Sequence, residues 1–379
     1  MAEQDRAEGI VGPWLDALLR STGALEPFDA HTHIGRNDPD GFRQTPEQLL
    51  GALGRIDARA ACFAMAEPDG YSIPNDTVIA TAEASEGRLV PYCRLDPRDD
   101  PLTEARRCMD AGARGIKLHP RAEGFTLAEP SVIDIFAFAH ELAVPLLIHA
   151  GRGIPALGEQ AIELARAYPA AKVILAHSAV SDLAWLWRVL PEVPNVFIDT
   201  SWWNPADLMA LFTLVRPGQI LWASDSPYGR PSGSLAFQLR CAVQAGLSPD
   251  SIRMIAGGQM DRLLSGEPGL DLGPAPGPSP LTDPALERIA SHLYSAFGRA
   301  IEDQDTNEPL SLAELACSDP SHPQPELLLA LLELIGLARD AGIEQTEDRP
   351  HPPEIEFIIA ALLVARTPAA AVPGPAPSN

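Results

Sequence analysis

Eight short apolar runs, spaced about 23 to 33 residues apart, alternate with segments of helical periodicity over the first two thirds of the chain. The runs lie at 27–33, 59–66, 88–94, 114–119, 145–149, 172–177, 195–199 and 219–224. Several of them are apolar throughout rather than alternating, as expected of parallel strands that are covered on both faces. Eight consecutive βα units predict a (β/α)8 barrel, a fold of the α/β class.

Histidine or aspartate ends several of these predicted strands. The first strand carries His31 and His33, and because alternate residues of a strand face the same way, their imidazoles project to one side. Later strands end in His119, His149, His177 and Asp225. A parallel barrel gathers such ends at one face, where its active sites lie. A doubly wound sheet, the competing fold, would not bring the first, fifth, sixth and eighth strands to one point.

These strand ends offer ligands for a divalent metal ion, namely His31, His33, His149 and Asp225. Catalytic Zn²⁺ takes nitrogen and oxygen ligands and leaves a position for water, whose pKa it lowers toward neutrality. Three imidazoles and a carboxylate are borderline ligands, which favours Zn²⁺ over Mn²⁺, the second candidate. Asp225 can also act as a base toward that water. His177 can polarise a substrate carbonyl or shuttle a proton, the alternative being a core histidine bonded to the backbone.

Lys117 is one of only two lysines in the chain, and it stands at a strand end beside His119. Three interpretations remain open for it: contact with the substrate, a carbamate that bridges a second metal ion, or a structural ion pair. We favour one metal ion, and expect Lys117 and His119 to bind the substrate.

Other side chains are candidates for the pocket. Arg152 follows the ligand His149 closely enough to bind an anionic substrate group, and Arg36 and Arg121 are similar candidates. Trp202 can wall the pocket, although it can equally be a packing residue. The remaining histidines lie in a helix or in the C-terminal part and are not expected to be ligands: His140, His292, His322 and His351.

The rest of the chain divides by composition. From residue 270 onward there are 17 acidic residues against 5 arginines. Thr45 and Gln48, which flank Pro46, predict the capped start of a helix. We expect five parts: an N-terminal helix (1–24), the barrel (25–266), a Pro/Gly-rich linker (267–281), an acidic helical extension (282–367) and a disordered tail (368–379).

Charge and cysteine usage exclude several classes of protein. A formal charge of −23 argues against nucleic-acid binding and against attraction to anionic membranes. The five scattered cysteines suggest neither a zinc knuckle nor a disulfide framework. With an acidic N-terminus and no apolar run of bilayer length, a soluble cytoplasmic protein is expected. Its expected partner is a small-molecule substrate, and the sequence leaves open whether it forms a homo-oligomer.

Five motifs together resemble, in order and spacing, the metal-dependent amidohydrolase superfamily: 31–33, 115–120, 147–151, 174–177 and 222–227. The nearest branch looks like the amidohydrolase-2 group, which includes lactonases, hydrolases and non-oxidative decarboxylases such as aminocarboxymuconate-semialdehyde decarboxylase. The resemblance covers about residues 25–265, and residues 257–263 resemble the closing helix of that group with Gln259 in place of Asn. It implies a TIM barrel with one divalent metal ion on His31, His33, His149 and Asp225, and His177 as the catalytic histidine.

Three functional hypotheses follow. The leading one is a hydrolase that uses a metal-activated water at the C-terminal mouth of the barrel to cleave an amide, ester or lactone of a small molecule. The alternative is a metal-dependent non-oxidative decarboxylase of a small unsaturated or aromatic carboxylic acid. A third is a non-catalytic metal-binding scaffold that acts through its helical extension, against which the intact set of ligands argues.

Overall fold

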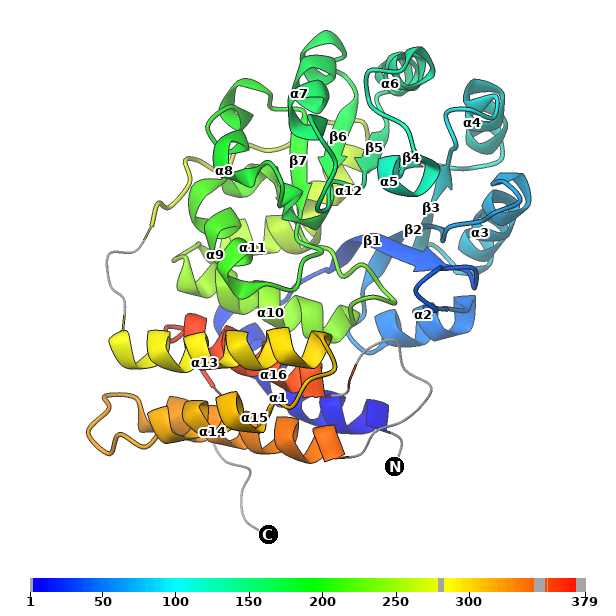
Figure 1. Cartoon of the computed structure of the whole chain (residues 1–379). Coiled ribbons are helices and arrows are strands. Elements are labelled where there is room, and N and C mark those ends of the chain that lie inside the picture. The colour runs from blue at the N-terminus through cyan, green and yellow to red at the C-terminus, as the bar shows by residue number, and fades with distance from the viewer. Residues whose placement is uncertain (1–2, 279–282, 344–351, 353, 373–379) are drawn as a thin grey trace.

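The computed structural model describes residues 3–278, 283–343, 352 and 354–372 (Figure 1). Its eight strands are parallel and hydrogen-bonded in chain order from β1 to β8. They are β1 (Phe28–Ile34), β2 (Arg59–Ala64), β3 (Leu89–Arg94), β4 (Gly115–Leu118), β5 (Pro145–Ile148), β6 (Lys172–Leu175), β7 (Val196–Asp199) and β8 (Ile220–Leu221).

The ring of strands is closed by main-chain hydrogen bonds between β1 and the segment after β8. The amide of Ala30 donates to the carbonyl of Trp222, and that of His33 donates to Ser226. Strand β8 ends at Leu221, short of the predicted 219–224, and the chain beyond it bonds to β1 through Trp222, Asp225 and Ser226. The predicted (β/α)8 barrel is confirmed.

Helices cover the outside of the strands (Figure 1). They are α2 (Pro46–Gly54), α3 (Ser72–Ala84), α4 (Pro101–Asp110), α5 (Pro120–Glu123), α6 (Pro130–Leu142), α7 (Leu157–Ala167), α8 (Leu183–Leu186), α9 (Pro205–Leu214), α10 (Pro231–Gln244), α11 (Pro249–Arg253) and α12 (Gln259–Leu264). The capping box of Thr45 and Gln48 at the start of α2 is present as predicted. Buried aromatic and aliphatic side chains such as Phe63, Tyr92 and Ile174 fill the barrel interior.

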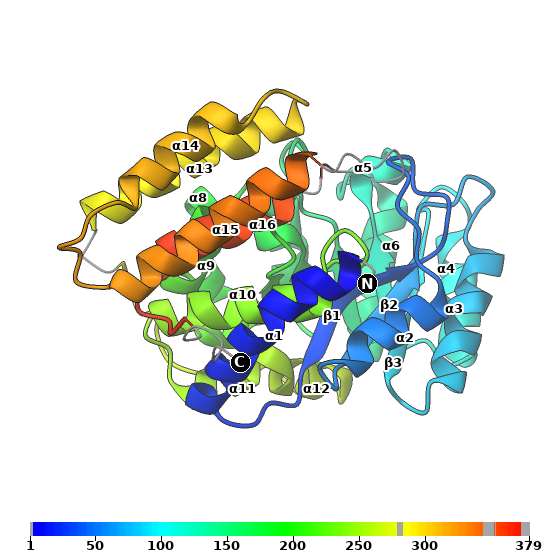
Figure 2. The same cartoon turned by 90° about the horizontal axis from the view of Figure 1, so that it is seen from below.

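The C-terminal helices form a second layer below the barrel in Figure 1. They are α13 (Pro284–Ile301), α14 (Asn307–Ala316), α15 (Pro325–Ile343) and α16 (Glu354–Arg366). Buried side chains including Leu293, Leu331 and Ile358 give these helices a core of their own. Seen from below, they lie against the same side of the barrel as α1 (Glu3–Thr22) (Figure 2). Helix α16 contacts both α9 and α10.

Arg240 of α10 joins the barrel to the end of α16. Its side chain is fully buried, and its guanidinium donates to the Thr367 hydroxyl (2.9 Å) and to the Thr367 and Ala371 carbonyls (3.0 and 2.9 Å). It also lies over the ring of Trp14 in α1. A cation at a helix C-terminus is favourable because the last carbonyls lack helical partners. Burial lowers the pKa of Arg240 to about 10.

The segment predicted as a linker contains no helix or strand in its described part, 267–278, and the Gly277 amide donates to the carbonyl of Thr213. Residues 279–281 of the predicted linker, residue 282 of the predicted extension, 373–379 of the predicted tail, and His351 lie outside the described residues. None of the described helices combines the length and the apolar character needed to cross a lipid bilayer.

Candidate active site

His31, His33 and Asp225 meet at the carboxyl-terminal mouth of the barrel. Nε2 of His31 lies 3.2 Å from Nε2 of His33 and 3.1 Å from Oδ1 of Asp225. Nε2 of His33 lies 3.1 Å from the same carboxylate oxygen. His177 joins the group, because ligand atoms of His31, His177 and Asp225 all lie within 4.8 Å of one another. Four residues from three strand ends, up to 194 residues apart in sequence, therefore converge at one point.

Asp199, at the end of β7, fixes the orientation of His31. Nδ1 of His31 lies 2.8 Å from Oδ2 of Asp199, so this nitrogen donates its hydrogen to the carboxylate. The proton on Nδ1 leaves Nε2 of the neutral ring with a free lone pair, directed toward His33 and Asp225. A carboxylate behind a histidine is the usual arrangement for a metal ligand, because it fixes the tautomer and raises the basicity of the ring.

His177 sits in a strained turn that directly follows β6. Its φ is 58°, in the left-handed region, and Asp225 has a φ of 59°. The His177 amide donates to Asp199 (3.0 Å), and its Nδ1 donates to the carbonyl of Ser201 (2.9 Å). Left-handed backbone at non-glycine residues is costly and is frequent at active sites, where neighbouring hydrogen bonds hold it in place.

His149 reaches this cluster through His177, since its Nδ1 lies 2.8 Å from Nε2 of His177. Because Nδ1 of His177 donates to Ser201, its Nε2 accepts from Nδ1 of His149, and Nε2 of His149, buried without a hydrogen-bond partner among the described residues, keeps a free lone pair. His119 stacks on His149 with 3.8 Å between ring centroids, and its Nδ1 accepts from the amide of Ala122. His119 thus supports a neighbour that is itself a candidate ligand.

Lys117 is fully buried beneath the cluster. Its Nζ lies 3.2 Å from Nε2 of His31 and 4.7 Å from the centre of the Phe63 ring. Burial lowers the pKa of this amine to about 7, against the attraction of Asp225. The lysine faces the candidate ligands, and its predicted contact with substrate stays a prediction.

Burial sets the protonation of the cluster. It lowers the pKa of the His31, His33 and His149 rings well below the usual value, and nearby cations lower it further. Burial also raises the pKa of Asp225, against the attraction of Lys117. Neutral imidazoles are the form that binds metal ions, and a bound dication would reverse the shift at the carboxylate.

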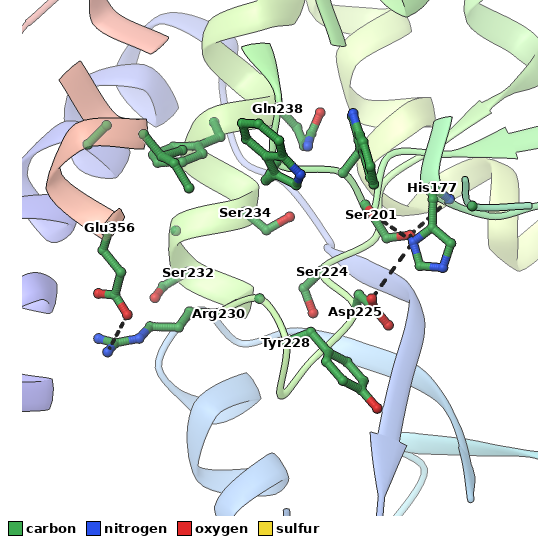
Figure 3. Close-up of a pocket in the computed structure, with 18 of the residues that line it drawn as sticks. His177, Ser201, Ser224, Asp225, Tyr228, Arg230, Ser232, Ser234, Gln238 and Glu356 are labelled. Carbon is green, nitrogen blue, oxygen red and sulfur yellow. Dashed lines mark hydrogen bonds and ion pairs between the residues drawn. The ribbon is translucent and has the colours of Figure 1, made fainter. Parts of the chain in front are cut away.

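A cavity of about 400 Å³ opens from the cluster toward the C-terminal helices. His149, His177 and Asp225 line one end of it, and Glu356 of α16 lies at the other, with residues of α10 between them (Figure 3). Its size falls within the range usual for sites of small-molecule ligands.

Some of the predicted pocket residues line the cavity and others do not. Arg121, Arg152 and Trp202 line the cavity, and the Arg152 guanidinium lies over the Trp202 ring at 5.3 Å from its centroid. Arg36 is exposed and lies outside the cavity lining. Its proposed contact with an anionic substrate group has no support in the geometry of this cavity.

Other site residues were not predicted from the sequence: Asp199, Ser201, Tyr228, Arg230 and the residues of α16. Asp199 could have been found, because it ends the predicted strand 195–199 just as Asp225 follows the next one. Arg230 and α16 carry no comparable signal, since their place in the cavity depends on how the C-terminal helices dock.

Comparison with known families gives a match over most of the barrel. A family model described as "Amidohydrolase" matches residues 28–258, which is more than half of the chain. A search of curated proteins found no match.

Several solved structures share the fold. One is a putative amidohydrolase from Staphylococcus aureus, with 15% identity and a TM-score of 0.52 over 64% of this chain and 100% of that one. Another is 2,6-dihydroxybenzoate decarboxylase from Rhizobium, with 14% identity and a TM-score of 0.51 over 64% of this chain and 99% of that one. A 2,6-dihydroxybenzoate decarboxylase complexed with 2,6-dihydroxybenzoate has 13% identity and a TM-score of 0.50, over 64% of this chain and 100% of that one. At these identities the likeness concerns the fold.

Proposed function

The chain belongs to the amidohydrolase family, and from this premise we propose that it is a metal-dependent hydrolase that cleaves an amide, ester or lactone bond of a small molecule. The observation that carries the proposal is the convergence of His31, His33 and Asp225, of which Asp225 lines a cavity together with His177. Zinc as the ion and a cytoplasmic location stay predictions from the sequence.

The residues present fit one divalent metal ion, to be held by His31, His33, His149 and Asp225. Neutral imidazoles with a carboxylate are a donor set suited to Zn²⁺, with Mn²⁺ as the second candidate. The hydrogen bond from His31 to Asp199 supports the place of His31 in this set. His149 turns its Nδ1 toward His177, and the ligand atoms that the structure brings within 4.8 Å of one another belong to His31, His177 and Asp225, so His149 as a ligand stays a prediction from the sequence. A divalent ion at such a site supplies Lewis acidity, which polarises a carbonyl group and acidifies water.

The chain's own groups would manage the protons of hydrolysis. Asp225 accepts a proton from the attacking water as the water oxygen bonds to the carbonyl carbon. When the C–O or C–N bond breaks, Asp225 returns that proton to the leaving group. His177, held through Nδ1 by the Ser201 carbonyl, orients the substrate carbonyl toward this attack.

A decarboxylase is the second candidate, favoured by one specific observation. Arg121 and Arg152 both line the cavity, and a guanidinium can bind a carboxylate in a fixed orientation. The substrate of this alternative is a small unsaturated or aromatic acid, and the fold similarity to 2,6-dihydroxybenzoate decarboxylase is compatible with it.

Elemental analysis and a paired activity screen test the proposal. Protein purified without chelator or added metal should hold about one Zn²⁺ or Mn²⁺ per chain and hydrolyse members of a panel of lactones, esters and amides. His31→Ala should lose both properties. His140→Ala is the matched control, because His140 lies on α6 and accepts a hydrogen bond from the Ala170 amide, away from the cluster.

Other results would support a different function or a different metal content. Release of CO2 from 2,6-dihydroxybenzoate without lactone, ester or amide hydrolysis would replace the hydrolase by the decarboxylase. Two ions per chain would add a second site at Lys117 as a carbamate. Absence of metal after reconstitution would contradict both enzymes and favour a scaffold.

A further inference from the structure

Helix α16 forms the far wall of the cavity, although it lies outside the part of the chain matched by the family model. Phe357, Ile359 and Ala360 of this helix line the cavity together with Leu334 of α15. The same cavity is lined on the barrel side by apolar side chains, namely Trp202, Trp203 and Phe237. The space beside the candidate catalytic groups is therefore bounded by hydrophobic surface from two separate parts of the chain.

Helix α16 carries apolar side chains on two sides, one toward the core of the C-terminal helices and one toward the cavity. Ile358, Ala361 and Leu362 are fully buried in the core of the C-terminal helices. Phe357 and Ala360 lie on the side that faces the cavity. A helix with one face in a core and the other in water carries polar residues on the outer face. Phe357, Ile359 and Ala360 also pack against the core of the C-terminal helices, which accounts for part of their apolar character, and the surface that they turn toward the cavity suits an apolar group.

Several contacts hold this wall in place. Trp203 stacks on Phe297 of α13 with 4.0 Å between ring centroids. The Tyr294 hydroxyl of the same helix donates to Oδ1 of Asn204 (2.9 Å). These bonds tie the C-terminal helices to the loop after β7, which also carries Trp202. Contacts within the chain therefore hold α16 beside the cavity, and no ligand is needed to position it there.

The charges at this end of the cavity cancel. Arg230 and Glu356 form an ion pair of 2.9 Å, and they are the charged side chains that line the cavity near α16 (Figure 3). The pair leaves no net charge there for a charged substituent to neutralise, although Nη1 of Arg230, which is buried without a partner among the described residues, can still donate to a polar atom. In contrast, Arg121 lies on the short helix α5, which follows β4, and Arg152 lies on the loop that follows β5.

We propose that the substrate carries a bulky, uncharged apolar substituent, which lies between the Trp202 loop and α16 while its reacting carbonyl lies at Asp225 and His177. This rests on the proposed hydrolase activity and adds the class of substrate to it. Burial of an apolar substituent should raise kcat/KM by about fourfold for each added methylene group until the cavity is filled. Phe357, Ile359 and Ala360 are then the residues that determine specificity.

A series of γ-lactones tests the proposal, from γ-butyrolactone, which has no side chain, to γ-decalactone. Wild-type protein should show a rising kcat/KM along the series. Ala360→Phe fills the cavity from its far wall, and should remove most of the rise. Leu329→Ala is the matched control on α15, because Leu329 is exposed and lies outside the cavity lining. It should keep the wild-type dependence on chain length.

Calorimetric binding separates this inference from the proposed hydrolysis. Cyclopentanone and 2-hexylcyclopentanone mimic the lactones but have no ester bond to cleave. Tighter binding of the hexyl compound, lost in Ala360→Phe, would support the apolar site even if no lactone were turned over. Equal binding of the two ketones, or lactone hydrolysis independent of chain length, would overturn the inference while leaving a hydrolase in place.

Discussion

Nδ1 of His31 donates a hydrogen bond to Asp199 across 2.8 Å, so that the end of β7 determines which nitrogen of a β1 histidine is available for a metal ion. Asp199 also accepts from the amide and hydroxyl of Ser201 and from the amide of His177. One carboxylate thus positions both a candidate ligand and the candidate catalytic histidine.

Asp199→Asn should weaken metal binding about 10- to 100-fold, because an amide no longer holds the Nδ1 proton of His31 as a carboxylate does. Competition with a chromogenic chelator measures the affinity. Asp134→Asn serves as the control, since Asp134 is an exposed residue on α6. An affinity equal to that of the wild type in Asp199→Asn would show that this hydrogen bond does not tune the site.

Removal of the metal ion should lower the thermal stability of the protein. A ligand that binds only the folded state stabilises it by about 2.7 kcal/mol when its free concentration is 100 times its dissociation constant. The melting temperature, measured before and after dialysis against a chelator, should therefore fall and recover on addition of Zn²⁺. For His31→Ala, the melting curves measured before and after dialysis against the chelator should coincide. The proposed site is wrong if wild-type protein melts at one temperature throughout.

Arg240→Met should destabilise the chain by at least about 2 kcal/mol, because it removes buried charged hydrogen bonds to carbonyls that then lack partners. Urea denaturation measures this loss. Arg188→Met is a closely matched control: the exposed Arg188 also donates to a carbonyl, that of Ala184, and also lies over an indole, that of Trp187. An equal loss of unfolding free energy in the two variants would show that Arg240 does not anchor α16.

Acid should weaken the start of α13. Despite some desolvation, hydrogen bonds from the amides of Ala285 and Leu286 and from His322 lower the pKa of Asp283 below its usual value. A carboxylate with a depressed pKa contributes stability that is complete above its unfolded pKa and is lost as the pH falls through the folded value.

Asp283→Ala should therefore cost about 1 kcal/mol at pH 7, the typical value of a helix N-cap. The difference from the wild type should shrink as the pH falls below the ordinary aspartate pKa of 3.8. Urea titrations at pH 7 and pH 3 give the comparison. A difference that stays the same at both values would mean that the ionised carboxylate does not contribute.

The barrel could be predicted because each of its strands is a short apolar run, and local hydrophobic patterns reveal such runs directly. Convergence of His31, His33, His177 and Asp225 then follows from the geometry of parallel strands. Asp199 obeys the same rule, but its role as the hydrogen-bond acceptor of His31 depends on the placement of β1 and not on any local motif.

Other parts of the site depend on tertiary packing, which local patterns do not encode. Phe357 is 132 residues from Asp225 in the chain, yet both line one cavity. The sequence predicts a helical extension over 282–367, but not where its helices dock. Conversely, Arg36 follows a metal-ligand motif closely in sequence but is exposed, because the loop after β1 carries it away from the cavity.

The origin of the far wall in α16 has a practical consequence for protein engineering. Reaction chemistry and the fit of the distant substituent are encoded in separate stretches of the gene, one within residues 28–258 and the other within 354–366. Randomising the codons for Phe357, Ile359 and Ala360 would therefore vary the size of the accepted substituent, while the strand ends that hold the reacting groups are left as they are.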